Sequence, residues 1–309
     1  MKVITLGRGD GSQIAYARLL CLVLLACAHD VEGSSAKVIA EHSDNGAQQE
    51  LHASSNSQGA AIGDMRDVEA ALHGFPTMYD LQGKKLANGE FTQWLENDLL
   101  HINLVYDFGS AHRLEEKSVL RQKPRLVQEE WAWREFQSGK LVRYFEVNFK
   151  SGKANAEKFD GKKTSSWSEN IDVEPGRTFA GFGFVLALKN LRGRLVDGQK
   201  VELKGVGFTP KPRVCSVELS YCGLEQMRMA GRIITGDRFL IHPKVPAIAK
   251  VFMEVKDAHV WLTLPRPAGF LRWEGPLIEA GDPVLRVDLL TGEHSWPAEP
   301  VRTISDPSK

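Results

Sequence analysis

Three residues in the C-terminal half have side chains that could bind a metal ion. Asp257 and His259 are two positions apart, so a strand would point both to one face, and His242 could approach from the segment before them. Convergent imidazole and carboxylate groups are typical ligands of a mononuclear metal, which could serve a hydrolase or a metal-binding protein. No HExxH, CxxC or nucleophile-elbow motif accompanies them. The alternative is a turn aspartate and a surface histidine. We assign no catalytic residue and expect no cofactor.

Large apolar residues suggest a second kind of site, a groove for a hydrophobic ligand. Trp131 and Trp133 lie two positions apart and would share one face of a strand, while Trp261 and Trp273 lie on later strands. Such residues can line a cavity, or they can fill a core that needs large side chains, and the sequence leaves both open. The candidates for groove residues are Trp131, Trp133, Phe179, Phe182, Leu186, Trp261 and Trp273.

The longest apolar stretch beyond the N-terminal region, residues 178–191, is predicted to be a buried helix. Thr178 stands where an N-cap would, and Lys189 and Arg192 suit the negative end of the helix dipole. Apolar residues cover every side, so no stripe faces water. A buried strand is the alternative, because Gly181 and Gly183 are poor helix formers. These glycines lack the context of a phosphate-binding loop, so we expect them at packing or bulge positions.

Short runs with alternating apolar and polar residues predict strands on both sides of this helix. Turn residues separate them at intervals typical of an antiparallel meander. The predicted fold is therefore mainly β, an antiparallel meander curled into a half-barrel or barrel around one principal buried helix. The predicted strands are 90–95, 99–108, 113–120, 126–136, 141–150, 154–159, 164–171, 200–206, 213–221, 226–234, 248–255, 259–264, 270–278 and 284–290.

The N-terminal region has the features of a targeting segment. Arg18 precedes an apolar run that is too short to span a bilayer, so residues 1–28 read as a signal peptide. Leu24-Leu25-Ala26-Cys27 resembles a lipobox, which would make Cys27 a lipidation site and tether the protein to the outer membrane from the periplasm. Ala26-Cys27-Ala28 would instead release a soluble exported protein, and a cytoplasmic location is the remaining alternative. We expect a flexible linker over 29–74, a β-rich domain over 75–292 and a loose tail over 293–309.

The charge balance bears on the binding partners of the protein, and the cysteine positions bear on whether a disulfide can form. Lys plus Arg and Asp plus Glu both number 39, so the formal net charge is zero and nothing suggests a nucleic-acid partner. Cys215 and Cys222 remain beyond the signal peptide. On one strand they would lie about 23 Å apart, well beyond the reach of a disulfide. We therefore expect two free thiols, although a turn between them would allow a bond.

The order of features in the second half resembles a known family. The apolar helix ends in Leu-Arg-Gly-Arg-Leu-Val-Asp-Gly at 191–198, a strand pair is expected around 223–225, and Trp261 precedes Pro-Ala-Gly-Phe-Leu-Arg-Trp-Glu-Gly-Pro-Leu at 267–277. This order, over about residues 85–290, is similar to an uncharacterised bacterial envelope family, a domain of unknown function whose fold is similar to the β half-barrels of lipoprotein carriers. Export, the β-rich meander, a helix that is apolar on every side and the lack of a catalytic motif together suggest a non-enzymatic envelope protein whose partner is a lipid or another hydrophobic small molecule, held in an apolar groove. A metal-dependent hydrolase and a purely structural envelope module are the alternatives.

Overall fold

The structure is a computed structural model of the 309-residue chain and describes residues 67–244, 255–264, 267–279 and 281–289. All of these belong to the compact unit Asn56–Lys309. The predicted signal peptide, Cys27, the linker as far as residue 66, nearly all of the predicted strand 248–255 and the tail lie outside the described residues. Within the described part of the chain, no helix is long and apolar enough to cross a membrane.

The first half of the described chain is a meander of antiparallel strands, as predicted. Side chains alternate between a buried inner face and an outer face, which is why Leu100, Ile102 and Leu104 of one strand are all core residues. The strands are β1 (Leu72–Gly74), β2 (Thr77–Tyr79), β3 (Lys85–Glu96), β4 (Leu99–Gly109), β5 (His112–Arg121), β6 (Val127–Gln137), β7 (Lys140–Asn148), β8 (Lys153–Asp160) and β9 (Lys163–Asn170).

The second half contains the helix and the remaining strands. Its neighbouring strands are also antiparallel, except that β10 pairs with β11 in parallel. The elements are β10 (Thr178–Phe179), α1 (Gly183–Val196), β11 (Val201–Phe208), β12 (Pro212–Met229), β13 (Arg232–Lys244), β14 (Ala258–Thr263), β15 (Phe270–Pro276) and β16 (Val284–Asp288).

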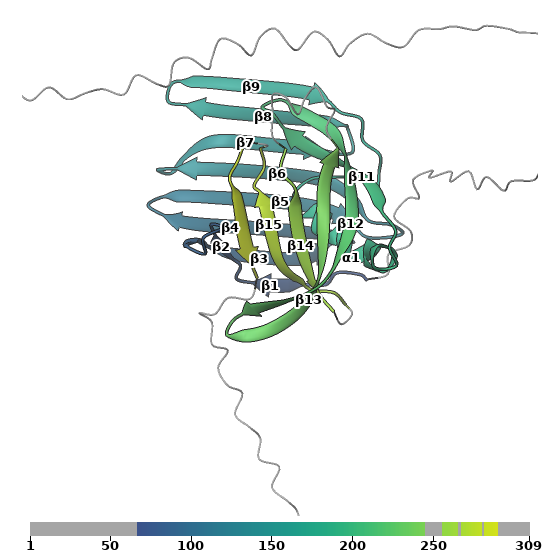
Figure 1. Ribbon diagram of the computed structural model, residues 1–309. Coiled ribbons are helices and arrows are strands. Elements are labelled where there is room, and N and C mark those ends of the chain that lie inside the picture. The colour runs from purple at the N-terminus through teal and green to yellow at the C-terminus, as the bar shows by residue number, and fades with distance from the viewer. Residues whose placement is uncertain (1–66, 245–254, 265–266, 280, 290–309) are drawn as a thin grey trace, which may run out of the picture. The chain divides into compact units, whose positions relative to one another are not determined.

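The sixteen strands of the described residues form one curled sheet, in which β16 pairs with β2. The path runs from β10 through β16 to β2 and on to β9, and β1 pairs with β3. Figure 1 shows β11 to β15 lying across the meander. One hydrophobic core contains residues from both halves and from α1. The predicted mainly β, curled architecture is confirmed; no pairing between the edge strands β9 and β10 closes the sheet in the described residues.

The buried helix is confirmed, but its limits differ from the predicted 178–191. Residues 178–179 form β10, and α1 begins only at Gly183 and continues to Val196. The left-handed conformation of Gly181, with φ of +52°, separates the two elements. The Thr178 hydroxyl accepts a hydrogen bond from the Glu174 N–H at 2.8 Å and does not cap the helix.

Two further sequence expectations were wrong. The predicted strands 213–221 and 226–234 were separated at Gly223, but Gly223 lies inside β12, where it takes up a bulge. The hairpin turns at Ala230 and Gly231, both with positive φ as two-residue hairpin loops require.

The folded domain also begins before residue 75, because β1 pairs with β3. Free Cys215 and Cys222 on the same strand agree with the prediction.

Candidate functional site

The three candidate metal ligands do not assemble into a site. His242 Nδ1 lies 2.7 Å from Asp257 Oδ1, and both side chains are about two-fifths exposed. His259 on β14 lies with its ring 5.9 Å from that of Trp261. Burial, followed by the charge of Arg238, lowers the pKa of His259. No cluster of three or more His, Cys, Asp or Glu residues that could hold a metal exists among the described residues, so the metal-hydrolase hypothesis has no support.

Four of the predicted groove residues fill the core. Trp131, Trp133, Phe179 and Leu186 are at most 3% exposed. The Trp131 ring stacks on Phe208 at 5.7 Å between centroids. Because these side chains are enclosed by the two halves of the sheet and by α1, they act as packing residues. Of the two possibilities that the sequence left open, lining a cavity or filling a core, these four residues follow the second.

Trp261 lies away from this core, in a separate cluster with Met227, Met229 and Leu271. Its strand neighbours Val260 and Leu262 belong to the main core, so alternation points Trp261 to the opposite face of β14. The Arg238 and Arg272 guanidinium groups lie 5.3 and 5.8 Å from its ring centroid. Trp261 is therefore not part of an inner groove.

Phe182 and Trp273 are the two predicted groove residues that remain partly exposed next to the core. The Phe182 ring lies 4.9 Å from Phe91 and meets Phe270 edge-on at 5.5 Å. Phe270 is also partly exposed. Phe270 and Trp273 are the register partners of the core residues Leu262 and Val260, so both belong to the inner face of β15.

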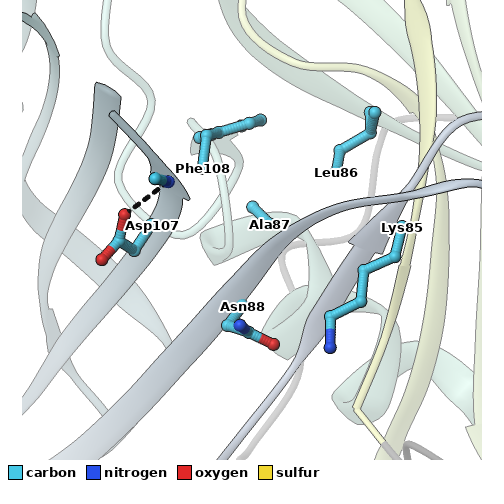
Figure 2. Close-up of a pocket in the computed structure, with 7 residues that line it drawn as sticks. Lys85, Leu86, Ala87, Asn88, Asp107 and Phe108 are labelled. Carbon is cyan, nitrogen blue, oxygen red and sulfur yellow. Dashed lines mark hydrogen bonds between the residues drawn. The ribbon is translucent and has the colours of Figure 1, made fainter. Parts of the chain in front are cut away.

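The register of the sheet connects Trp273 with a pocket that the sequence did not indicate. Trp273 pairs with Val287, Val287 with Met78, and Met78 with Ala87, so the four lie in one row across β15, β16, β2 and β3. Ala87 lines a cavity of about 280 Å³. In Figure 2, Ala87 lies between Leu86 and Phe108. The lining residues are Lys85, Leu86, Ala87, Asn88, Asp107, Phe108 and Gly109.

Both apolar and polar groups border this pocket. Leu86 and Phe108 are partly exposed and pack against the main core. Asp107 Oδ1 accepts a hydrogen bond from the Gly109 N–H at 2.7 Å (Figure 2). The residues that form the pocket sit where β3 begins and β4 ends. Only the register of β2, β3 and β4 brings them together, which is why no local motif marked them.

A charged network lies beside the pocket at the same end of the meander. The His112 ring stacks on Phe108 at 4.3 Å, and its Nε2 lies 3.0 Å from Glu135 Oε1. Arg143 binds Glu135 and also Glu279 and Asp282, the latter two at 2.9 Å each. Lys158 Nζ lies 2.6 Å from Glu279. The network ties the β15–β16 connection to the inner face of β6, β7 and β8.

In this network the ion pairs shift the pKa values so that both acidic and basic groups are held in their charged forms, as expected of a structural ion cluster. Burial alone would raise the pKa of Glu135, but hydrogen bonds and the charge of Arg143, with bonds from Gln137 and His112, hold it below its usual value. Burial likewise opposes the charge of Arg143, yet Asp282 and Glu135 raise its pKa overall. Each of these charged groups has an opposite partner, so none is placed to act as an acid or base.

Two polar side chains on the inner face hold the chain just before α1. Gln128 of β6 accepts the Ala180 N–H at 2.8 Å and donates to the Ala180 carbonyl at 3.1 Å. Glu116 Oε1 of β5 accepts the Phe182 N–H at 2.7 Å and the Trp131 indole N–H at 2.9 Å. Burial raises the pKa of Glu116, and these two hydrogen bonds offset part of that rise.

The two glycines in this segment are needed for close packing, as the sequence suggested. A Cβ on Gly181 would lie 2.0 Å from Glu116 Oε1, and one on Gly183 would lie 2.5 Å from Gln128 Oε1. Glycine therefore permits both side chains to reach the backbone.

Comparisons with known proteins give little beyond the fold. No protein-family model matches the sequence, and no curated protein matches it. Among solved structures, the chain is similar to a beta-barrel-like protein of the domain of unknown function DUF1849 from Brucella abortus. The TM-score is 0.41 at 10% identity, over 72% of this chain and 98% of that one. A likeness at this level carries no information about activity.

Proposed function

We propose that this protein is a non-enzymatic binding protein that holds a hydrophobic small molecule, such as a lipid or acyl chain, against the inner face of its curled sheet. The observation that carries the proposal is the partial exposure of three inner-face aromatic residues, Phe182, Phe270 and Trp273. Large aromatic side chains next to a core are normally covered, because each can bury about 150 to 250 Å² of surface. A bound apolar chain would cover them.

The pocket supplies a place for such a chain to enter. Its volume of about 280 Å³ is at the lower limit for ligand sites, so it accommodates part of a long molecule better than a whole one. Leu86, Ala87 and Phe108 give it an apolar wall. Trp273 lies three strands away in the same row, beyond Met78 and Val287, which are at most 6% exposed. The binding surface is smaller than the sequence suggested, because Trp131, Trp133, Phe179 and Leu186 fill the core.

Binding of a neutral fluorescent acyl-chain probe to the purified chain, together with native mass spectrometry after mild extraction, tests the proposal. We expect saturable binding that Phe182→Ala and Trp273→Leu each weaken by about tenfold, which corresponds to about 1.4 kcal/mol. Trp94→Leu is the matched control, since Trp94 is 41% exposed and stacks on His101 of β4. A ligand-free mass spectrum combined with no binding by the unmodified chain would contradict the function.

We also propose that the protein acts in the periplasm, tethered to the outer membrane through Cys27. The lipobox-like Leu24-Leu25-Ala26-Cys27 supports the tether, and a carrier of hydrophobic molecules has a use for membrane proximity. Cys27→Ala should abolish lipid labelling and release the protein from membranes. Unchanged membrane association of that variant would exclude lipidation.

A further inference from the structure

Glu116 and Tyr106 are polar residues on the mainly apolar inner face of β4 and β5, where Ser118 is a further buried polar residue. Leu104 pairs with Glu116, and Tyr106 pairs with Leu114, so the two polar residues are diagonal neighbours. Side chains in diagonal positions are within reach of each other when they are long or aromatic. The negative charge of Glu116 contributes, after burial, to raising the pKa of Tyr106, which agrees with their proximity.

Only one oxygen of Glu116 accepts hydrogen bonds from the described part of the chain. Oε1 accepts the N–H groups of Phe182 and Trp131. Among the described residues, Oε2 has no hydrogen-bond partner, and no cationic side chain pairs with the carboxylate. Burying a carboxylate without a counter-charge is unfavourable, and Glu116 Oε2 can still accept a hydrogen bond from a donor.

The Tyr106 hydroxyl likewise lacks a hydrogen-bond partner among the described residues. Tyr106 is 7% exposed, and within the described chain its hydroxyl makes no hydrogen bond. Some polar side-chain atoms of the described residues are both fully enclosed and without a hydrogen-bond partner, and neither the Tyr106 hydroxyl nor Glu116 Oε2 is one of them. Since both of these atoms lack a partner, they must keep some solvent-accessible surface, although Phe91, Leu104 and Leu114 of the main core are close to them in the sheet.

We propose that Glu116 and Tyr106 form a polar subsite that selects an amphiphile with a hydrogen-bond-donating head group, an ammonium or a hydroxyl, over one with a carboxylate. This inference rests on the proposed function. The apolar chain of the ligand would lie against Phe182, whose N–H is bound to Glu116, so head and chain would contact adjacent groups.

The preference follows from charge and hydrogen bonding. An ammonium supplies the counter-charge that Glu116 lacks, and a hydroxyl donates to Oε2 while accepting from Tyr106. A ligand carboxylate would place a second negative charge beside Glu116, and like charges at short range disfavour binding.

Three ligands with the same chain test the subsite: dodecylamine, dodecanol and dodecanoate, at one neutral pH and below their aggregation concentrations. We expect the unmodified chain to bind dodecylamine about tenfold more tightly than dodecanoate. Glu116→Gln should reduce this difference to less than about threefold, and Tyr106→Phe should weaken dodecanol binding by about threefold or more. Glu115→Gln is the control, because Glu115 is the next residue on β5 and pairs with Arg113.

The outcomes separate the subsite from the function. Equal affinity of the unmodified chain for amine and carboxylate would overturn the subsite and leave the binding function in place. A preference that persists in Glu116→Gln would overturn it as well. Absence of binding by all three ligands would overturn both. The comparison of ligands on the unmodified chain needs no variant, so it decides the question even where a substitution prevents folding.

Discussion

Arg192 of α1 forms an ion pair with Asp237 of β13, whose side chain is 2% exposed. The Asp237 carboxylate also accepts the Tyr221 hydroxyl at 3.0 Å. Since Glu116 and Gln128 hold the chain at the other end of α1, the helix connects the meander with the second half of the sheet. The position of Arg192 is therefore explained by this pair, and the helix dipole is a secondary consideration.

Arg192→Met should destabilise the protein by about 3 to 5 kcal/mol, because Asp237 is left buried without its counter-charge. Urea denaturation measures this change in the free energy of unfolding. Lys200→Met is the control, since Lys200 is 68% exposed in its pair with Glu218 and such pairs contribute about 0 to 1 kcal/mol. A loss below about 1 kcal/mol for Arg192→Met would show that Asp237 is solvated when the pair is removed.

Truncation of two apolar residues near the helix should have unequal effects. Leu186 is 1% exposed, so Leu186→Ala should remove about 2 to 5 kcal/mol of stability. Phe182 is partly exposed and loses fewer packing contacts, so Phe182→Ala should remove about 1 kcal/mol and change ligand affinity instead. Equally severe losses of stability without any change in binding would mean that Phe182 belongs to a filled core.

Gly181→Ala tests the close approach of Glu116 to the backbone. The added Cβ would meet both Glu116 Oε1 and, at 2.3 Å, Trp131 Nε1, in addition to the strain of a positive φ. Gly161 has a similar φ of +58° and nothing within 4 Å of its Cβ, so Gly161→Ala isolates the backbone strain of about 1 kcal/mol. Thermal denaturation should show a clearly larger loss for Gly181→Ala, and matching losses would contradict the steric role.

The stability of the protein should depend on pH through Glu116 and Glu135 in opposite directions. The folded-state pKa of Glu116 is raised above its ordinary 4.5, so its contribution is fully present below that pH and is lost as the pH rises through the folded pKa. The pKa of Glu135 is lowered, so its contribution is present above pH 4.5 and is lost as the pH falls.

Urea unfolding between about pH 2 and about pH 8 measures both effects. The stability of the unmodified chain relative to Glu116→Gln should decrease as the pH rises above 4.5 and then level off. Relative to Glu135→Gln, it should increase as the pH rises toward 4.5. A stability difference from Glu116→Gln that does not vary with pH would mean that Glu116 titrates normally.

Local patterns predicted the strands well where a two-residue turn followed a clean alternation. Asn97 and Asp98, with φ of 51° and 62°, turn the chain between β3 and β4 as expected. The same reasoning failed at Gly223, because a glycine can serve a bulge as well as a turn and only the register of β12 against β13 distinguishes them.

The candidate site was predictable only in part, since its residues are brought together by pairing between distant strands. Phe182 and Trp273 were identified from their size, but size alone did not separate them from Trp131, which fills the core. Glu116 stood in a charged strand with no motif around it. Its role depends on Trp131 and Phe182, which lie 15 and 66 positions away in the chain.

The pairing of β2 with β16 also sets the order in which the strands can pair as the chain folds. Thr77 and Asp288 are register partners about 210 residues apart, whereas β2 to β9 are joined by local hairpins. Contacts between near neighbours form before contacts that close long loops. Until β16 is available, the meander has its inner-face residues Trp131 and Phe145 uncovered. The newly made chain therefore passes through a stage at which its largest apolar surface is open to aggregation or to a chaperone.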